Sequence, residues 1–334
     1  MKRILFRADA KPSIGIGDLV SLIQLSWYFE GKGWETYFAV RKTPAAQALV
    51  QRHDIQRVEF LPERCRLSDE IAFLNRFITG CRPDVLFFEI TERPLREYSG
   101  LTEVPLKACI CFDRELPADW DLVANWDVAA AGLYDQRRFP KTHFLLGPEY
   151  VVLPPSFDMA AAARRRRKPT VKTVLVAMGG ADEFDFTSRV AAAFLDAPGG
   201  FNLHVVVGAG YEKREALESL LNASRCPCRL SVNVPDMFPH YMEADLAVGA
   251  GGLTSSELVA TRTPAALVAT YEHQIARCEY FARRGWARYW GFRSFSPKQV
   301  RQVLAEPPAP APRGVFHPAA IKDAVEELHA RHRH

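Results

Sequence analysis

Apolar and polar positions divide the chain into two kinds of segment. Short apolar runs, typical of buried strands, are separated by longer stretches in which apolar residues recur at helical spacing. Strands that alternate with helices predict an α/β protein with mostly parallel sheets. In the first half the predicted strands are Ile4–Asp9, Thr36–Arg41, Arg57–Leu61, Val85–Ile90, Leu106–Asp113 and Leu122–Asn125, and the predicted helices are Asp18–Gly31, Ala45–His53 and Ser68–Thr79.

The second half repeats this pattern from a new start. Both halves open with a strand that leads into a glycine turn and then a helix. Two such halves predict two Rossmann-like domains with a ligand cleft between them. The predicted strands of the second half are Thr173–Met178, Leu203–Gly208, Arg229–Val234, Leu246–Gly249 and Ala265–Thr270, and the predicted helices are Thr187–Leu195, Lys213–Asn222, Thr254–Thr261 and His273–Arg284.

Changes in composition indicate the domain boundaries. Residues 154–169 read PPSFDMAAAARRRRKP and show no strand pattern, and residues 306–312 are rich in proline. The basic block Arg164–Lys168 is interpreted as a solvated linker surface, with contact to phosphates or to an anionic membrane as the alternative. The expected parts are a first domain over 1–160, a basic linker over 161–169, a second domain over 170–295, and a tail over 296–334 whose last helix, 318–331, packs back on the first domain.

Bulk composition narrows the class of protein. The chain has 334 residues, of which 48% are apolar and 25% charged, and its formal net charge is +4. This mild charge argues against a nucleic-acid partner, which usually requires a stronger basic surface. Seven cysteines without a CxxC pair or zinc-type spacing are typical of reduced thiols in a cytoplasmic protein. We expect no transmembrane helix, which needs about 18 apolar residues, and no signal peptide.

The segment Gly15-Ile-Gly17-Asp18 raises the first question of chemistry. A dinucleotide-binding loop needs a third glycine where Val20 stands and an acidic residue where the second strand ends in Arg41, so NAD binding is disfavoured. The two glycines allow a large group to approach the backbone. Asp18 is either an N-cap of the following helix or a catalytic base that faces a cleft.

A second candidate site lies where a strand ends in Gly179-Gly180 and a helix follows. Glycines expose backbone N–H groups and a helix N-terminus favours anions, which together predict a phosphate-binding turn. The acidic residues Asp182, Glu183 and Asp185 would repel phosphate unless they face away. A purely structural tight turn is the alternative.

Residues 245–291 carry the most specific pattern. A strand ends in three glycines within four residues, the last of them Gly252, and the next helix opens with Thr254 and Ser255. Backbone and hydroxyl groups at the start of such a helix can bind a diphosphate.

Three more residues extend this motif. Glu257 lies in the first turn of the helix, where an acidic residue can accept hydrogen bonds from a ribose. By itself Glu257 is also explained as an acid that complements the helix dipole. His273 and Gln274 follow the next strand, at the end where α/β proteins bind ligands.

In their order and spacing these motifs resemble the GT-B superfamily. Within it, the chain is most similar to the UDP-sugar hydrolases of pseudaminic acid biosynthesis and the spore-coat polysaccharide biosynthesis proteins, and more distantly to the peptidoglycan N-acetylglucosaminyltransferases. The residues that carry the resemblance are Phe6-Arg7-Ala8-Asp9, Ile14-Gly15-Ile16-Gly17, Phe112-Asp113, Leu122-Val-Ala-Asn125, Met178-Gly-Gly-Ala-Asp182, Gly252-Leu-Thr-Ser-Ser-Glu257, Gln274 and Ala282-Arg-Arg-Gly285.

The resemblance implies a GT-B fold, in which two Rossmann-like domains face a central cleft and the second domain holds most of the nucleotide. It implies neither a metal nor a cofactor, because GT-B enzymes commonly stabilise the leaving diphosphate with backbone N–H groups and a helix dipole. The substrate is expected to be a UDP-sugar and Asp18 the catalytic base. The substrate-binding residues that the resemblance implies are Gly15, Gly17, Gly179, Gly180, Gly252, Thr254, Ser255, Glu257, His273 and Gln274.

Two positions depart from the hydrolases. The hydrolases carry His where this chain has Asp18, and an Asp-His-Tyr run where this chain reads Phe88-Glu89-Ile90-Thr91. An aspartate after the glycine turn is instead similar to antibiotic and sterol glucosyltransferases, in which it deprotonates an acceptor hydroxyl.

Three functions therefore stay open. The first is inverting displacement of UDP from a UDP-sugar by water, in surface-glycan or nonulosonic acid biosynthesis. The second is inverting transfer to an acceptor hydroxyl with Asp18 as base, and the third is nucleotide-sugar binding without catalysis. A glycan or lipid-linked acceptor would bring peripheral membrane contact through the basic block and the aromatic residues of 281–295, although core packing explains these aromatic residues better.

Overall fold

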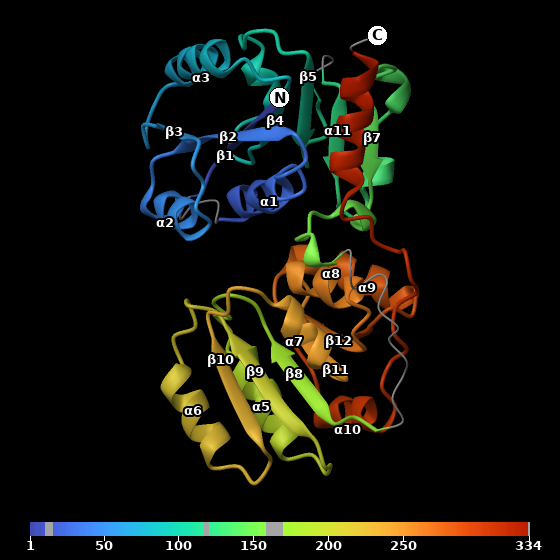
Figure 1. The fold of residues 1–334 in the computed structure, drawn as a ribbon. Helices are drawn as coiled ribbons and strands as arrows, with labels where there is room; N and C mark the ends of the chain where they lie inside the picture. The colour runs from blue at the N-terminus through green and yellow to red at the C-terminus, as the bar shows by residue number, and fades with distance from the viewer. Residues whose placement is uncertain (11–15, 117–119, 158–169, 333–334) are drawn as a thin grey trace. The chain divides into compact units, whose positions relative to one another are not determined.

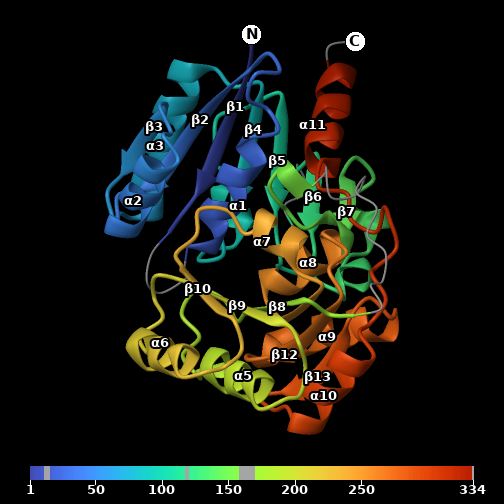
Figure 2. The same ribbon diagram turned by 60° about the horizontal axis from the view of Figure 1, so that its bottom comes forward.

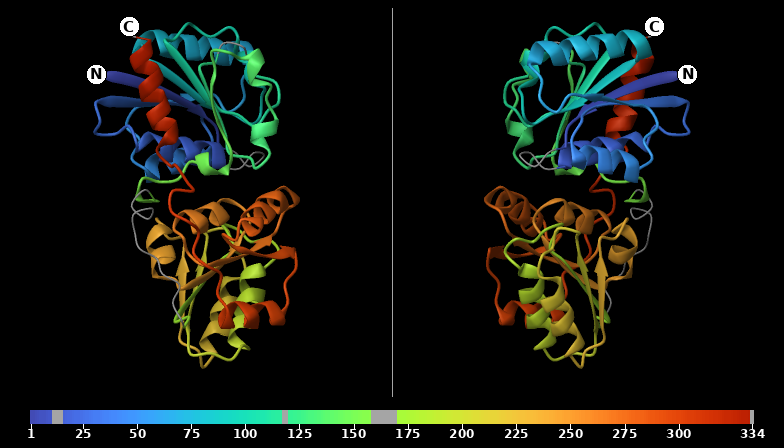
Figure 3. Two further views of the ribbon diagram at one scale, coloured as in Figure 1. Left: turned by 90° about the vertical axis from the view of Figure 1, so that its right-hand side faces the viewer. Right: turned by 90° about the vertical axis from the view of Figure 1, so that its left-hand side faces the viewer.

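The computed structural model describes residues 1–10, 16–116, 120–157 and 170–332. Contacts divide the chain into two units, unit 1 with Met1–Pro155 and His317–His334, and unit 2 with Ser156–Phe316. Each unit has one sheet of parallel strands with helices packed against it (Figures 1 and 3). The predicted α/β class is therefore confirmed.

Unit 1 is built on a seven-stranded sheet in the order β3-β2-β1-β4-β5-β6-β7. The strand order reverses between β1 and β4, and ligands of open α/β sheets bind outside the carboxyl ends of the strands at such a point. The strands are β1 Lys2–Ala8, β2 Trp34–Arg41, β3 Val58–Leu61, β4 Val85–Glu89, β5 Leu106–Ile110, β6 Leu122–Asn125 and β7 His143–Leu146.

Helices cover both faces of this sheet. Three helices share one apolar core with Phe6 of β1, and Ile321 and Val325 bring the last helix of the chain into that core. The opposite face packs against Leu74 and Ile78 of another helix (Figure 3). The helices are α1 Gly17–Ser26, α2 Pro44–Arg52 and α11 Ala320–Arg331 on the first face, with α3 Leu67–Cys81 and the 3-10 helix η1 Leu95–Tyr98 on the second.

A buried ion-pair network lies at the carboxyl ends of β1 and β2. Arg7 is fully buried and donates to both carboxylate oxygens of Asp9, at 2.6 and 2.8 Å. Glu70 of α3 accepts from Arg7 and from Arg41, and Arg41 Nε donates to Asp9 at 3.0 Å. Each buried charge thus has an opposite partner, which it needs in a medium of low dielectric. Arg41, which stands where a dinucleotide-binding domain would have an acidic residue, is part of this network.

Unit 2 is built on a six-stranded sheet in the order β10-β9-β8-β11-β12-β13, with its own reversal between β8 and β11. Figure 2 shows α5, α6 and α10 on one side of the sheet and α7 and α8 on the other. The elements are β8 Thr173–Ala177, α5 Phe186–Leu195, β9 Asn202–Val207, α6 Arg214–Asn222, β10 Cys228–Val232, α7 Phe238–Glu243, β11 Leu246–Ala250, α8 Leu253–Ala260, β12 Ala265–Ala269, η5 Glu272–Gln274, α9 Ile275–Arg283, β13 Arg288–Phe292 and α10 Pro297–Ala305.

The tail expected from residue 296 onward begins with a helix of unit 2. Val300 and Val303 of α10 are fully buried in the core of this unit, which extends to Phe316. A capping box starts the helix, because Ser296 Oγ accepts from the Gln299 N–H while the Gln299 side chain accepts from the Ser296 N–H.

The aromatic residues of 281–295 pack inside unit 2. Phe281 and Trp290 are buried, and Trp286 and Tyr289 are half-buried. The predicted basic linker lies outside the described residues. Within the described ranges, no helix combines the length and the apolar character that crossing a membrane requires.

Candidate functional site

Two adjoining cavities of about 200 and about 360 Å³ lie in unit 2. Their linings share four residues, Gly179, Gly180, Thr254 and Glu257. Gly179 and Gly180 follow β8, and Thr254 and Glu257 lie on α8, which follows β11. These four residues of the predicted site therefore meet where the strand order of the sheet reverses, the usual ligand position of such a fold.

The turn after β8 leaves room for a ligand. Gly179 has a φ of +98°, a conformation that favours glycine. A Cβ built on Gly180 would meet nothing within 4 Å. The backbone at Gly180 therefore faces open space in both cavities.

The start of α8 borders the larger cavity. Gly252 is its N-cap residue, and among the described residues no side chain caps this helix. Uncapped N–H groups and the helix dipole favour an anion here. Thr254 lines both cavities, but the Ser255 hydroxyl is turned back into the protein and donates to the Gly252 carbonyl at 2.6 Å. The predicted diphosphate contact of the Ser255 side chain is thus corrected, because this side chain is fully buried.

The helix after Gly179-Gly180 does not offer a free N-terminus. The Asp182 carboxylate accepts from the backbone N–H groups of Phe186 at 3.0 Å and Thr187 at 2.6 Å, so it caps α5. The α5 N-terminus is therefore already occupied by the Asp182 carboxylate, whereas no side chain of the described residues caps the start of α8.

Glu257 has an unusual environment at the junction of the two cavities. Burial raises the pKa of its carboxyl to about 7, and the nearby Asp236 adds to this, while a hydrogen bond from Tyr241 opposes it. The Tyr241 hydroxyl donates to Glu257 Oε2 at 2.6 Å. Tyr241 belongs to the short helix α7, and sequence reasoning missed it because nothing local marks this contact.

Gln274 and His273 have different positions. Gln274 is buried, its Oε1 accepts from the N–H of Thr270 at 2.9 Å and from its hydroxyl at 3.1 Å, and its Nε2 lies beside Gly252. Gln274 therefore lines the larger cavity as a donor. His273 is exposed, stacks on Tyr271 with ring centroids 5.8 Å apart, and lines neither cavity.

The smaller cavity continues beyond Glu257 as a mostly apolar slot. Its walls come from the carboxyl ends of β9 and β10 and from the start of α7. Sequence reasoning missed these residues, although most of them stand at the carboxyl ends of two predicted strands, which was a signal. The additional lining residues are Val206, Val207, Gly208, Asn233, Val234 and Met237.

In unit 1, Asp18 lies near the carboxyl ends of β1 and β4. It occupies the second position of α1, whose N-cap residue is Ile16, so it is not the N-cap. Asp18 Oδ2 accepts from the N–H of Thr91 at 3.1 Å and from its hydroxyl at 2.9 Å. Burial raises the pKa of Asp18, and the charge of Asp9 adds to this, while the Thr91 hydrogen bonds oppose it.

A second carboxyl group accompanies Asp18. Glu89 is 2% exposed, and its Oε2 has no hydrogen-bond partner in the part of the chain that the structure describes. Burial, and then the Asp18 charge, hold the pKa of Glu89 well above its ordinary value. Glu89 therefore holds its proton more tightly than an ordinary glutamate, and its surroundings oppose ionisation of both carboxyl groups at once. Of the glycines before Asp18, Gly17 is exposed and Gly15 lies outside the described residues.

Comparisons with known proteins agree with this architecture. No family model matches the chain. Over 236 residues it is 26% identical to the spore coat polysaccharide biosynthesis protein SpsG of Bacillus subtilis, a match that covers 68% of each chain. MurG of Acinetobacter baumannii has a similar structure, with a TM-score of 0.63 at 14% identity over 100% of this chain and 95% of that chain. The UDP-GlcNAc 2-epimerase of Methanocaldococcus jannaschii gives a TM-score of 0.61 at 10% identity, and the match covers 98% of this chain and 99% of that chain.

These likenesses extend over nearly the whole length of the solved structures. They show that the chain has the GT-B fold, with two Rossmann-like units, as the resemblance implies.

Proposed function

We propose that the protein is a nucleotide-sugar enzyme that displaces UDP from a UDP-sugar with inversion at the anomeric carbon, and that water is the acceptor. The observation that carries this proposal is the pair of cavities joined at Glu257. The relative SpsG supports a role in surface-polysaccharide biosynthesis by its name, and the epimerase supports a UDP-sugar by its own.

The two cavities match the parts of such a substrate in order. The mostly apolar slot would receive the planar base. Glu257 at the junction would accept hydrogen bonds from the two ribose hydroxyls. The uncapped start of α8, with Thr254 and the Gln274 amide, would bind the diphosphate, and the sugar would extend toward the wall formed by Glu183 and Phe184.

Asp18 would then act as the general base. As water attacks the anomeric carbon, one water proton passes to the Asp18 carboxylate and the bond from carbon to the diphosphate oxygen breaks. The electron pair of that bond leaves with UDP, whose developing charge the α8 dipole and N–H groups stabilise. The raised pKa of Asp18 supports this role, because a base works best when its pKa lies near the working pH.

The alternative acceptor is a sugar or lipid-linked hydroxyl. An aspartate at position 18 is consistent with transfer to such a hydroxyl, because a carboxylate that takes a proton from water can also take one from a hydroxyl bound in the same place. Binding without catalysis is the third possibility, and it predicts nucleotide-sugar affinity with no UDP release.

The test is to incubate the protein with a panel of UDP-sugars and to measure UDP release with and without added acceptor alcohols. Release in buffer alone supports the hydrolase, and release only with an acceptor supports the transferase. Binding without release in either arm would leave only the binding function. If no UDP-sugar binds and none releases UDP, the proposal as a whole is refuted.

The Gly180→Ala variant tests the position of the diphosphate. The added methyl group enters open space and leaves the melting temperature unchanged. If the ligand occupies that space, UDP-sugar affinity falls about tenfold, which corresponds to modest overpacking. Calorimetric titration and thermal denaturation measure the two effects. The control is Gly132→Ala in unit 1, where a Cβ also meets nothing within 4 Å, and equal affinity for both variants would contradict the proposed position.

Nucleotide-sugar affinity is expected to depend on pH through Glu257. With a pKa of about 7, its carboxylate is mostly ionised at pH 8 and mostly protonated at pH 6, and only the ionised form accepts from both ribose hydroxyls. Affinity for UDP-N-acetylglucosamine should therefore fall about tenfold from pH 8 to pH 6. This ligand suits the titration because its doubly esterified diphosphate keeps its charge. A flat profile would show that the Glu257 carboxylate does not contact the ribose.

A further inference from the structure

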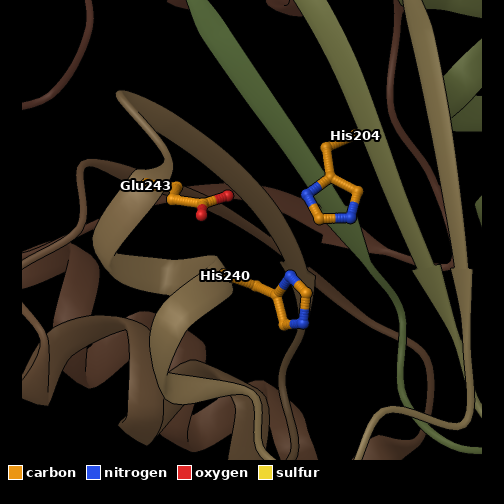
Figure 4. Close-up of side chains that lie close together, drawn as sticks. All are labelled: His204, His240 and Glu243. Atoms are coloured by element: carbon orange, nitrogen blue, oxygen red, sulfur yellow. The ribbon is translucent and has the colours of Figure 1, made fainter.

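A second cluster of chemically active side chains lies on the β9 side of unit 2. His204 comes from β9, and His240 and Glu243 come from α7. Figure 4 shows the three side chains directed toward one another. Each offers one ligand atom, and these atoms all lie within 4.8 Å of one another. None of the three residues lines either cavity of the candidate nucleotide site.

The spacing along α7 contributes to this arrangement. His240 and Glu243 are three residues apart, so they share one face of the helix. Tyr241, on another face, contacts Glu257. The short helix α7 thus joins the cluster to the nucleotide site without sharing ligand atoms with it.

The ring of His204 is held in an orientation that suits a metal ligand. It is 5% exposed, and its Nε2 lies 3.0 Å from Ser231 Oγ on the neighbouring strand β10. This hydrogen bond leaves Nδ1 for the cluster. A histidine that binds a metal almost always uses its other ring nitrogen in this way, which fixes the tautomer and the orientation of the ring.

His240 supplies a second, independent observation. Its Nδ1 is buried, and among the residues that the structure describes it has no hydrogen-bond partner. Buried polar atoms in native structures nearly always have a partner or bind an ion or water. The ring of His240 lies 4.9 Å from that of His204, at an interplanar angle of 64°. A cation between the rings would satisfy the Nδ1 atom.

Glu243 completes the ligand set from the solvent side. Its side chain is 59% exposed, and its Oε2 lies 3.7 Å from Nη1 of the equally exposed Arg229. Such an exposed ion pair is worth little, so the carboxylate can turn to a cation at small cost. Arg229 nevertheless places a positive charge near the cluster and competes with a cation for the same carboxylate.

We propose that His204, His240 and Glu243 bind one divalent transition-metal cation, of which Zn²⁺ is the best match. Two imidazoles and one carboxylate are a usual three-ligand set for zinc, with water in the fourth position. Imidazole nitrogen disfavours Mg²⁺ and Ca²⁺, which prefer oxygen ligands. Ligand atoms around tetrahedral zinc are about 3.3 Å apart, so the three side chains would move closer together, and Glu243 is the most exposed of them. The cation would fasten α7 to β9 and β10.

The cation is separate from the proposed reaction. The resemblance to GT-B enzymes implies no metal at the anomeric centre, and this site lies on another face of α7. Its test is therefore a binding and stability measurement without nucleotide, and its outcome does not depend on the proposed function.

The experiment titrates Zn²⁺ into the full chain after treatment with a chelator. We expect one Zn²⁺ bound per chain by calorimetry, a higher melting temperature with Zn²⁺, and no change with Mg²⁺. The Glu243→Gln and His240→Gln variants should each weaken binding about tenfold or more. The Arg229→Gln variant removes the competing charge and should tighten binding.

Two results would overturn the proposal. One is the absence of stoichiometric Zn²⁺ binding by the unsubstituted chain. The other is binding that both glutamine variants retain at full affinity, which would place the metal elsewhere, for example at Cys226 and Cys228. Glu243 is exposed, so Glu243→Gln keeps the test decisive even if His240→Gln fails to fold.

Discussion

The Asp18→Asn variant is expected to release UDP from UDP-sugars about 10²- to 10⁴-fold more slowly than the unsubstituted protein, the usual loss when a general base is removed. The amide keeps an oxygen that can accept both Thr91 hydrogen bonds, so the position of the side chain is preserved. What the variant loses is the ability to take a proton from the acceptor. Steady-state UDP release and calorimetric affinity for the same UDP-sugar are the two measurements, and only the first should change.

The neighbouring carboxyl group supplies the matched control. Burial and the Asp18 charge raise the pKa of Glu89 well above its ordinary value, so Glu89→Gln replaces a carboxyl that resists ionisation with a neutral amide of similar shape. This variant should retain most of the turnover. If instead Glu89→Gln loses as much activity as Asp18→Asn, the two carboxyl groups act together. If Asp18→Asn retains full activity, Asp18 is not the base.

The alternation of apolar runs and helical spacing was enough to predict both parallel sheets. Parallel strands are buried on both faces, so each appears as a short apolar run that composition alone reveals. Two strands were not predicted. β7 is four residues long and half exposed, and in β13 a glycine interrupts an aromatic run that also contains an arginine. At such positions pairing with the neighbouring strand stabilises the extended conformation, and the local sequence has little preference for it.

Helices were predicted according to the strength of their local signals. α7 has six residues and a proline in its first turn, which is too short for periodicity to appear. α10 does carry a signal, the capping box of Ser296 and Gln299, but the proline-rich stretch after it indicates a tail. A start signal of this kind deserves more weight than the composition of the following segment.

Glycine motifs predicted the lining of the larger cavity better than polar side chains did. Glycines mark where the backbone must turn or stay open, which depends on local geometry, and Gly179, Gly180 and Gly252 all border the larger cavity. The direction of a side chain depends on tertiary packing. Thr254 and Ser255 are adjacent in sequence, yet one faces the cavity and the other faces its own helix.

Contacts between distant residues could not be predicted from one sequence. Thr91 donates to Asp18 across 73 positions, and Tyr241 donates to Glu257 across 16. Neither pair follows a local motif. These contacts influence the pKa values of Asp18 and Glu257, so the sequence singled out both carboxyl groups but not the contacts that shift their pKa values.

The Glu257→Gln variant is expected to bind UDP-sugars about 100-fold more weakly, since it loses hydrogen bonds from two ribose hydroxyls to a charged acceptor. The same variant should be more stable than the unsubstituted protein at pH 8. Burial raises the pKa of Glu257 from an ordinary 4.5 to about 7 in the folded protein. The folded state therefore binds the proton more tightly than the unfolded state, and this contribution is complete below pH 4.5 and lost as the pH rises through 7.

At pH 8 the unsubstituted protein holds a buried carboxylate, which glutamine replaces with a neutral amide that can still accept from Tyr241. We expect the variant to melt on the order of 5 °C higher at pH 8 and at nearly the same temperature at pH 5. The Glu218→Gln variant of α6 is the control, because this partly exposed side chain makes only a surface ion pair with Arg214, and we expect no effect on binding and little on the pH dependence of stability. If the variant loses affinity but is no more stable at pH 8, burial of the Glu257 carboxylate does not destabilise the folded protein. If UDP-sugar affinity falls while the melting temperature at pH 8 rises, the ionisable carboxylate at position 257 lowers the stability of the fold and is needed for binding.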